Sequence, residues 1–288
     1  MPYSYHQIIS CLTASGIPAP DAREEALLLL ESFSQANRVD ILCDRHRIYD
    51  APGLDAAVQR RLARYPLQYI LGEWAFFGLT FKVNEHCLIP RPDTEILVET
   101  AIRTLPQGGV FADLCTGSGC IAISVLKHRP DLTAVALELF DETLALATQN
   151  AELHRVRDRF IPLCADLLTN GREALASYAP LCGIVSNPPY IPKADVEALA
   201  PELFFEPRAA LDGGADGMIF YEKILSDYTD LLSPDAPILF EISYDGAEKM
   251  RDLGKKHLPH ASCEIIRDLE QNPRVATFLH PAAPFGIS

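Results

Sequence analysis

Positive charge is scarce in this chain of 288 residues. Lys and Arg number 25 against 39 Asp and Glu, which gives a formal net charge of −14 at pH 7. A protein that holds duplex DNA through its phosphates is expected to be basic over its contact surface. The deficit argues against nucleic acid as the main partner, although a local basic patch is compatible with it.

Hydrophobic runs long enough to cross a bilayer are also missing. The longest apolar stretches, such as Ala26–Leu30, are far too short, and the first residues lack the basic and apolar regions of a signal peptide. We therefore expect a soluble protein with no membrane partner.

Metal-binding pairs of cysteine are absent as well. None of the eight cysteines has Cys-x-x-Cys spacing with another, and no histidine stands at zinc-ligand spacing from a pair. We expect no bound metal. Because the cysteines lie in apolar stretches such as residues 181–185, we interpret them as buried, reduced thiols of a cytoplasmic protein.

The chain otherwise has the composition of an ordinary globular protein, with 48% apolar and 22% charged residues. Its length predicts about two domains. The first 70 residues follow helical periodicity, and the capping-box spacing of Asp21 and Glu24 predicts a helix over residues 22–33. Arg60, Arg61 and Arg64 lie between apolar residues at helical spacing, and we interpret them as a solvated outer face rather than a binding patch.

Two β-prone runs, residues 74–77 and 79–83, flank Gly78 and predict a hairpin. Pro92 suits the first position of a helix over residues 93–103. We therefore divide the chain into a helical domain (1–70), a hairpin linker (71–90) and a larger domain (91–288).

Strand and helix patterns alternate through the larger domain, which indicates crossover connections and a mostly parallel sheet covered on both faces. The last two strands are joined by a turn at Pro273 that is too short for a crossover, so they must be antiparallel. The fold class is thus α/β and Rossmann-like, with seven strands, one of them antiparallel. The predicted strands cover residues 110–114, 133–137, 160–164, 183–186, 237–242, 263–267 and 275–279, and the predicted helices cover 120–127, 141–154 and 217–232.

The first of these strands runs into a glycine-rich turn, Cys115-Thr116-Gly117-Ser118-Gly119. Such a turn lets a ligand approach the backbone at a helix N-terminus. Glu138 ends the second strand, about 20 residues further on, where a carboxylate accepts hydrogen bonds from both ribose hydroxyls.

This turn formally satisfies the dinucleotide fingerprint, so a nicotinamide enzyme is one alternative. Asp113, at the tip of the first strand, argues against it because a carboxylate there would repel a pyrophosphate. The same carboxylate would attract the ammonium and sulfonium groups of S-adenosyl-L-methionine, which carries no phosphate. We favour this methyl donor over a nicotinamide cofactor and over a turn that binds no ligand.

The fourth strand ends in Asn187-Pro188-Pro189-Tyr190, which should face the same crevice. The prolines leave carbonyls free as acceptors, Asn187 adds a side-chain acceptor, and Tyr190 offers a ring for a planar group. Acceptors that hold both hydrogens of a planar NH₂ group would aim its poorly nucleophilic nitrogen at the sulfonium methyl.

With these motifs, the chain resembles the peptide chain release factor glutamine methyltransferases, the HemK/PrmC family, over nearly its whole length. The resemblance rests on both motifs above and on residues 66–73, 89–95, 206–208, 211–214 and 240–242. It implies a class I S-adenosylmethionine-dependent methyltransferase domain preceded by a helical substrate-recognition domain and a hairpin linker. The implied substrate is the glutamine of the Gly-Gly-Gln motif in class 1 release factors, and the implied product of the cofactor is S-adenosyl-L-homocysteine.

The resemblance also assigns roles to residues. It implies that Asn187, Pro188 and Tyr190 are catalytic and that the substrate amide is held by Asn187, Pro188, Pro189 and Tyr190. Asp113 would lie near the methionine end of the cofactor, and Asp166 near its adenine. The implied cofactor-binding residues are Asp113, Cys115, Thr116, Gly117, Ser118, Gly119, Glu138, Asp166, Leu167 and Asn187.

Four positions depart from the family pattern. Glu138 stands where Asp is usual, Cys115 where many relatives have Gly, and Leu167 where some place an aromatic residue against the adenine. Residues 270–274 lack the Gly often seen in the final turn. None of these is a residue expected to take part in methyl transfer.

Other functions stay open beside the release-factor enzyme. A sister group methylates glutamine in a ribosomal protein with the same tetrapeptide, and a nucleic-acid adenine methyltransferase can hold an adenine amine in the same way. The negative net charge argues against the adenine enzyme. A non-enzymatic binding module is disfavoured because the motif residues are intact.

Overall fold

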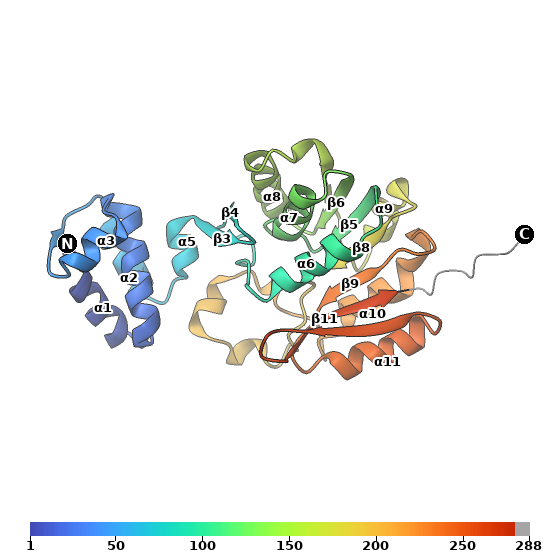
Figure 1. Ribbon diagram of the computed structural model, residues 1–288. Coiled ribbons are helices and arrows are strands. Elements are labelled where there is room, and N and C mark those ends of the chain that lie inside the picture. The colour runs from blue at the N-terminus through green and yellow to red at the C-terminus, as the bar shows by residue number, and fades with distance from the viewer. Residues whose placement is uncertain (280–288) are drawn as a thin grey trace, which may run out of the picture. The chain divides into compact units, whose positions relative to one another are not determined.

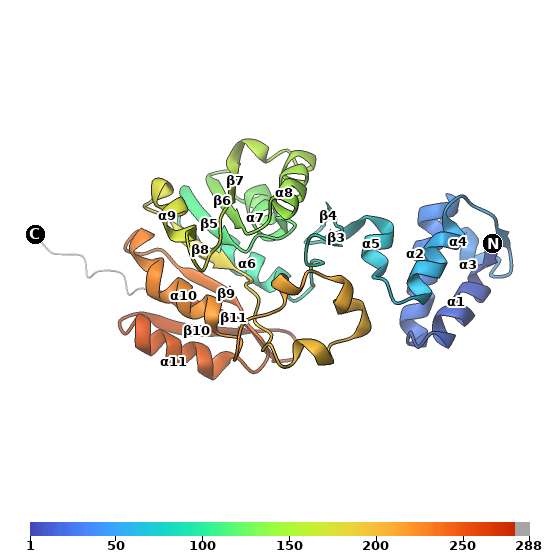
Figure 2. The same ribbon diagram turned by 180° about the vertical axis from the view of Figure 1, so that it is seen from behind.

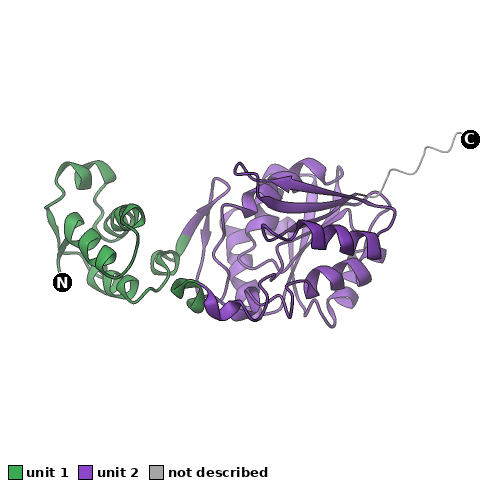
Figure 3. Ribbon diagram, turned by 90° about the horizontal axis from the view of Figure 1, so that it is seen from below, with its two compact units in different colours: residues 1–73, 200–205 green, residues 74–199, 206–288 purple. Residues whose placement is uncertain are grey.

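The computed structural model describes residues 1–279, which form two compact units. Unit 1 consists of residues 1–73 and 200–205, and unit 2 of residues 74–199 and the described chain from 206 to 279 (Figure 3). No local pattern in residues 200–205, far along the chain, indicates that these six residues belong with the N-terminal unit.

Unit 1 is helical, and its core is built from apolar residues such as Ile8, Leu12, Leu30 and Val58. A capping box is present at Ser4 and Gln7 of the first helix, whereas the one predicted at Asp21 is absent. The helices are α1 (Tyr5–Ala14), α2 (Ala19–Ser34), α3 (Arg38–Cys43), α4 (Leu54–Leu62) and α5 (Leu67–Leu71), and β1 (Tyr3–Ser4) pairs with β2 (Ile48–Tyr49). The predicted start of α2 was wrong because Pro18 already begins that helix, so Asp21 lies inside its first turn.

The arginines of α4 and the turn after it do not form a solvated face. Arg61 is only 4% exposed and pairs with Glu25 at 2.7 Å and with Glu202 at 3.0 Å. Arg64 also reaches Glu202, at 2.7 Å, while Arg60 lies over the ring of Tyr65. The prediction was wrong for Arg61 because two carboxylates far apart in sequence enclose it.

The predicted hairpin is confirmed as β3 (Glu73–Phe76) paired with β4 (Leu79–Lys82). Phe77 and Gly78 turn the chain with φ of 50° and 71°, so both are in the left-handed region. The helix expected from residue 93 is α6 (Thr94–Thr104), with Asp93 rather than Pro92 just before it.

The sheet of unit 2 has seven strands in the order β10-β11-β9-β8-β5-β6-β7. β11 alone runs in the opposite direction to the other six strands, as the short turn before it predicted. The strands are β5 (Gly109–Leu114), β6 (Leu132–Glu138), β7 (Phe160–Cys164), β8 (Gly183–Ser186), β9 (Ile238–Glu241), β10 (Ser262–Arg267) and β11 (Pro273–Leu279). All seven predicted strands are present, with ends shifted by two residues at most.

Helices cover both faces of this sheet (Figures 1 and 2). Adjacent residues of β5 point to opposite sides, since Phe111 belongs to one core cluster and Ala112 to the other. The first cluster is covered by α6, α7 (Cys120–His128) and α8 (Asp141–Leu153), and the second by α9 (Gly171–Leu175), α10 (Ile219–Asp227) and α11 (Ala247–His257). The predicted helix over 217–232 was too long, because α10 ends at Asp227 and a separate 3-10 turn follows.

None of the eight cysteines, all of which lie within the described residues, forms a disulfide, and only Cys87, Cys120 and Cys182 are buried. The prediction of buried thiols was wrong for Cys43 and Cys164, which are exposed. Within the described residues, no helix has the length and apolar character needed to cross a membrane.

Candidate active site

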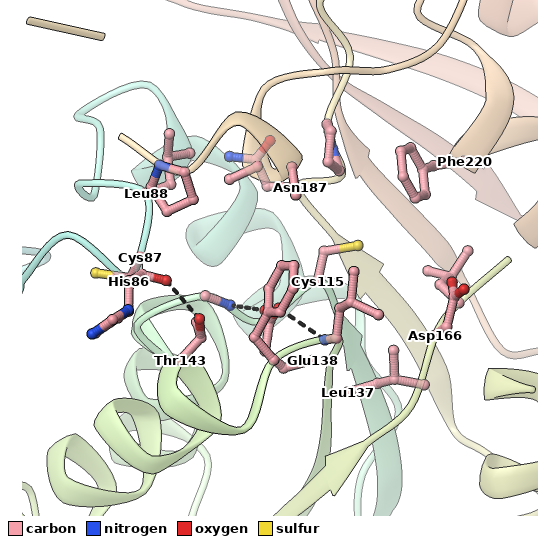
Figure 4. A pocket seen from close by; sticks show the side chains of 18 of the residues that line it. His86, Cys87, Leu88, Cys115, Leu137, Glu138, Thr143, Asp166, Asn187 and Phe220 are labelled. Carbon is pink, nitrogen blue, oxygen red and sulfur yellow. Dashed lines mark hydrogen bonds between the residues drawn. The ribbon is translucent and has the colours of Figure 1, made fainter. Parts of the chain in front are cut away.

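The parallel strands of unit 2 end at one edge of the sheet, and a cavity lies there. It encloses about 680 Å³, counted out to its opening to solvent. Cys115 follows β5, Glu138 ends β6, Ala165 follows β7 and Asn187 follows β8, and all four line it (Figure 4). Ligands of open α/β sheets bind in this position, so the cavity is the candidate active site.

The glycine-rich turn after β5 adopts a backbone that few side chains tolerate. Cys115, Gly117 and Gly119 have φ of 62°, 55° and 80°, all in the left-handed region. A Cβ on Gly119 would lie 2.9 Å from Ile123 Cδ1 and 3.2 Å from Ala147 Cβ. Gly119 thus lets the turn pack closely on α7 and α8, and Cys115 accepts a conformation that glycine adopts more readily.

Asp113 supports this turn from behind. It is fully buried, and its Oδ2 accepts hydrogen bonds from Thr116 Oγ1 at 2.6 Å and from the Ala122 backbone N–H at 3.2 Å. Burial raises the pKa of the carboxyl to about 7. Asp113 does not line the cavity, and its Oδ1 has no hydrogen-bond partner among the described residues. Its predicted position near the methionine end of a cofactor stays a prediction.

Glu138 joins the turn to the end of β6. Its Oε2 accepts a hydrogen bond from the Gly117 N–H at 3.0 Å and its Oε1 from the Leu139 N–H at 2.8 Å (Figure 4). Burial raises the pKa of Glu138, and these backbone donors oppose that effect. The carboxylate is therefore fixed at the wall of the cavity, with acceptor capacity left for the hydroxyl groups of a ligand.

Asn187 lies at the same cavity from the β8 side. Its Nδ2 donates a hydrogen bond to Thr94 Oγ1 at 3.3 Å. Pro189 also lines the cavity, whereas Pro188 and Tyr190 do not. Burial raises the pKa of Tyr190 well above its ordinary value, so its hydroxyl stays protonated near neutral pH.

Residues 211–217 pack against this tetrapeptide. The Ile191 N–H donates to the Leu211 carbonyl at 3.0 Å, and the Gly213 N–H donates to the Ile191 carbonyl at 2.8 Å. A Cβ on Gly213 would come within 2.7 Å of Tyr190 Cα. The Gly-Gly pair at 213–214, seen in the sequence without a role, thus allows a close backbone contact that holds the tetrapeptide.

The remaining predicted residues fall into two groups. Asp166 and Leu167, after β7, line the cavity, and Leu167 is 3% exposed. Thr116, Ser118 and Gly119 are buried within the turn and do not line it. The structure therefore brings seven of the predicted residues to one cavity, namely Cys115, Gly117, Glu138, Asp166, Leu167, Asn187 and Pro189.

Other residues of the cavity were not predicted. His86–Leu88, Phe140, Thr143, Pro207, Ala209, Ala210 and Phe220 also line it. One signal was available for residue 207, since Glu206-Pro207-Arg208 was among the recognised segments. Glu206 is 5% exposed, accepts a hydrogen bond from the Ile89 N–H at 3.0 Å and pairs with Arg91, so two recognised segments are tied together beside the cavity.

The lining is mostly apolar, with carboxylates at Glu138 and Asp166. Such a cavity suits a ligand with a flat apolar ring and a few hydroxyl groups. Six of the ten residues that the resemblance assigned to the cofactor thus line a space of matching chemistry, and the other four lie behind it.

Comparison with known proteins identifies both parts of the chain. Residues 5–72 match the family model described as PrmC N-terminal domain, and residues 92–232 match that of the methyltransferase small domain. A methyltransferase of Pyrococcus furiosus has a similar structure, with a TM-score of 0.50 at 18% identity over 78% of this chain and 96% of that one. This likeness confirms the predicted fold class.

Curated relatives cover nearly the whole chain. The release factor glutamine methyltransferase of Staphylococcus aureus is 34% identical over 87% of this chain and 90% of its own. The enzyme of the same name from Geobacter sulfurreducens is 41% identical over 79% of each chain. That of Nitratidesulfovibrio vulgaris is 36% identical over 90% of this chain and 88% of its own.

Proposed function

The chain belongs to the release factor glutamine methyltransferase family, and on this basis we propose that it methylates a glutamine of a release factor. The methyl group passes from S-adenosyl-L-methionine to the side-chain amide nitrogen of the glutamine in the Gly-Gly-Gln motif of class 1 release factors. The observation that carries this proposal is the position of Asn187, whose amide lies at the end of β8 on the cavity that Glu138 also lines.

The cavity fits the methyl donor. Ribose hydroxyl groups are donors, and Glu138 offers them carboxylate oxygens at the end of β6. The apolar side chains of Leu167 and Phe140 suit an adenine ring, with Asp166 beside them. The bound cofactor supplies an electrophilic methyl group on a sulfonium, and S-adenosyl-L-homocysteine is its product.

The turn after β5 would hold the rest of the cofactor. Cys115 and Gly117 line the cavity there, while Thr116, Ser118 and Gly119 shape the backbone behind them. Asp113 keeps the turn in place through Thr116 and the start of α7, and we assign it an electrostatic effect on the cationic end of the cofactor.

The task of the tetrapeptide is to orient a weak nucleophile. The nitrogen lone pair of a glutamine amide is delocalised, so positioning and charge stabilisation contribute more than a general base. Asn187 Oδ1 and the Pro188 carbonyl accept the two amide hydrogens and stabilise the positive charge that grows on the nitrogen. Pro189 shapes the cavity wall, and Tyr190 supports the planar amide from the side.

Mass spectrometry of a release factor after reaction tests this function. The protein is incubated with S-adenosyl-L-methionine and a purified class 1 release factor, and the expected result is one added methyl group on the Gly-Gly-Gln glutamine. A release factor in which this glutamine is replaced by alanine should gain no methyl group.

Parallel reactions separate the alternatives. A ribosomal protein with a methylated glutamine and duplex DNA are offered under the same conditions. Methyl transfer to the ribosomal protein or to DNA, with none to the release factor, would overturn the proposal. With a translation factor as substrate, we expect the protein in the cytoplasm, and its net charge of −14 gives no support to direct nucleic-acid binding.

A further inference from the structure

A buried carboxyl group lies next to the tetrapeptide without a role in the function proposed so far. Glu241 is the last residue of β9 and is 3% exposed. Strands β8 and β9 are parallel neighbours in which Ser186 pairs with Phe240. Asn187 and Glu241 are the residues that follow this pair, so they lie side by side at the end of the two strands.

Thr94 is the third member of this group. It is the first residue of α6, is 1% exposed, and accepts a hydrogen bond from Asn187 Nδ2 at 3.3 Å. Burial raises the pKa of Glu241 to about 7, while its hydrogen bonding to Thr94 and Asn187 acts in the other direction. Glu241 Oε2 is buried and has no hydrogen-bond partner among the described residues.

The backbone of Glu241 is also held in place, because Tyr221 Oη donates a hydrogen bond to its carbonyl at 2.7 Å. A buried carboxylate with incomplete hydrogen bonding is costly and requires a reason. The positions of Thr94 and Asn187 beside Glu241 supply that reason.

Counting donors and acceptors fixes the orientation of the Asn187 amide. An ionised carboxylate only accepts, and a threonine hydroxyl has a single hydrogen to donate. Thr94 Oγ1 accepts from Asn187 Nδ2, which leaves the Thr94 hydrogen to donate to the neighbouring carboxylate of Glu241. The NH₂ end of Asn187 is thereby directed to Thr94 and Glu241, and Oδ1 is left on the opposite side of the amide. No described residue donates a hydrogen bond to it.

We propose that Glu241 and Thr94 are positioning residues that hold Asn187 with Oδ1 facing the substrate amide. This inference rests on the proposed function. With the amide turned over, Asn187 would present NH₂ to the NH₂ of the substrate glutamine, and donors would face donors. The hydrogen-bonded series of side chains from Asn187 through Thr94 to Glu241 prevents that arrangement.

Ionisation of Glu241 is part of this arrangement. A protonated carboxyl can donate to Thr94 Oγ1, and the Thr94 hydrogen can then turn to Asn187 Oδ1, so the amide is no longer held in one orientation. The charged and titratable groups that act on Glu241 or feel its charge are Asp93 before α6, Arg274 on β11, Tyr190 after β8, Tyr221 on α10 and Cys120 on α7. Asp93 and Arg274 form an ion pair at 3.1 Å, so their charges largely offset each other.

Kinetics of Glu241→Gln and Thr94→Val test the proposal. Glutamine keeps the size of Glu241 but can donate to Thr94, and valine keeps the size of Thr94 but has no hydroxyl. We expect each change to lower kcat by about tenfold or more, as loss of a group that orients a catalytic side chain does. Binding of S-adenosyl-L-homocysteine, measured by calorimetry, should change by less than about threefold, since neither residue lines the cavity.

Two further variants act as controls. Thr94→Ser keeps the hydroxyl and should restore kcat to near the wild-type value. Thr100→Val makes the same change at a buried threonine of α6 that donates to the Ile96 carbonyl at 2.7 Å, and it should leave kcat unchanged. Equal losses in Thr94→Val and Thr100→Val, or a loss of cofactor binding that matches the loss of kcat, would indicate a purely structural role and overturn the proposal.

The pH profile gives a second measure. Wild-type kcat should fall below about pH 7, where Glu241 gains a proton. In Glu241→Gln this acid limb should be shallower, and what is left of it belongs to Asp113, whose pKa is also raised to about 7. An acid limb that is identical in both proteins contradicts the proposal.

A measurement without substrate separates this inference from the proposed function. The side-chain NH₂ signals of Asn187, observed by NMR in the complex with S-adenosyl-L-homocysteine, should shift with a midpoint near pH 7 in the wild type and not in Glu241→Gln. If no release factor is methylated but these signals shift as expected, the proposed function is wrong, and the inference that Glu241 and Thr94 orient the Asn187 amide is supported. If methylation occurs and the signals do not titrate, the inference fails alone.

Discussion

The side-chain amide of Asn150 donates a hydrogen bond to the backbone carbonyl of Ser118 at 2.9 Å. The same side chain accepts from the Lys82 N–H at 2.8 Å and donates to the Lys82 carbonyl at 3.0 Å. Asn150 is completely buried on α8, so one residue joins the hairpin strand β4 to the turn that follows β5.

Replacement of Asn150 by alanine should therefore loosen both segments. It leaves the buried contact to the Ser118 carbonyl and the two partly buried contacts to the Lys82 backbone without a partner, which we expect to lower the free energy of unfolding of unit 2 by about 2 kcal/mol. Affinity for S-adenosyl-L-homocysteine should fall as well, because the glycine-rich turn is less ordered. Urea denaturation and calorimetry measure the two effects. Gln149→Ala, at an exposed position on the same helix, is the control. Equal losses of stability and of affinity in the two variants would contradict the role of Asn150 in joining β4 to the glycine-rich turn.

Glu138 provides a test of the cofactor site. Glu138→Gln keeps the size of the side chain and removes the charge that ribose hydroxyl groups would meet. We expect the dissociation constant of S-adenosyl-L-homocysteine to rise by about tenfold, since a hydrogen bond to a charged acceptor contributes more than one to a neutral acceptor. Glu138→Asp keeps the charge and should bind more tightly than Glu138→Gln. Tighter binding by Glu138→Gln than by Glu138→Asp in calorimetry would show that the negative charge does not contribute to cofactor binding.

Asn187 provides the corresponding test of methyl transfer. Asn187→Ala removes the proposed acceptor for the substrate amide, and we expect kcat to fall by about 100-fold. Binding of S-adenosyl-L-homocysteine should weaken by less than about fivefold, because the other lining residues remain. Steady-state kinetics and calorimetry separate the two quantities. Activity similar to that of the wild type would exclude the amide clamp.

Local sequence patterns predicted the elements that bury apolar residues in a regular period. Strands β7 and β8 were predicted to the residue, because short apolar runs between turn residues have few alternatives. The motifs at Gly117 and Asn187 were found for a related reason, since each follows a strand of the sheet directly. The position of each motif is therefore set by residues close to it in the sequence.

Contacts between distant segments could not be predicted in this way. The burial of Arg61 depends on Glu202, which lies 141 positions further along the chain. The contribution of residues 86–88, 207, 209 and 210 to the cavity depends on Glu206, which joins the segment at Ile89 to the segment at Pro207. The role of Glu241 required the sheet order, because β9 lies beside β8 only through a crossover.

The pH dependence of stability follows from Asp113. Burial raises its pKa from an ordinary value of 3.8 to about 7. Between these pH values the unfolded chain has lost the proton and the folded chain has kept it, so stability falls as pH rises through this window and is constant above it. The effect of one such group is at most about 4 kcal/mol. Glu241, whose pKa is also raised to about 7, adds to the slope in the same direction.

Asp113→Asn should reduce this slope, because it cannot ionise. Urea denaturation of both proteins between about pH 5 and 8 measures the difference. We expect the variant to be less stable than the wild type at pH 5, where it only alters the hydrogen bonds to Thr116 and Ala122, and to lose less stability by pH 8. Parallel curves for the two proteins would mean that Asp113 ionises normally in the folded state.

Arg61 tests how residues 200–205 are held in unit 1. Its guanidinium is bound by Glu25 at 2.7 and 3.0 Å and by Glu202 at 3.0 Å, with 5% of the side chain exposed. Arg61→Ala removes this buried guanidinium from two partly buried carboxylates, of which Glu202 keeps Arg64, and we expect a loss of about 2 kcal/mol in the stability of unit 1. Circular dichroism during urea denaturation follows the helices of this unit.

Glu202→Gln acts on the same contact from the other side. It removes the charge that Arg61 and Arg64 share, so residues 200–205 should separate from α4 more often and be cut faster by a protease of broad specificity. Arg60→Ala is the control, since Arg60 is exposed and only covers the ring of Tyr65. Faster cleavage at residues 200–205 in Glu202→Gln and not in Arg60→Ala would establish that the ion pairs of Glu202, rather than the contact of Phe205 with Tyr65, hold this segment.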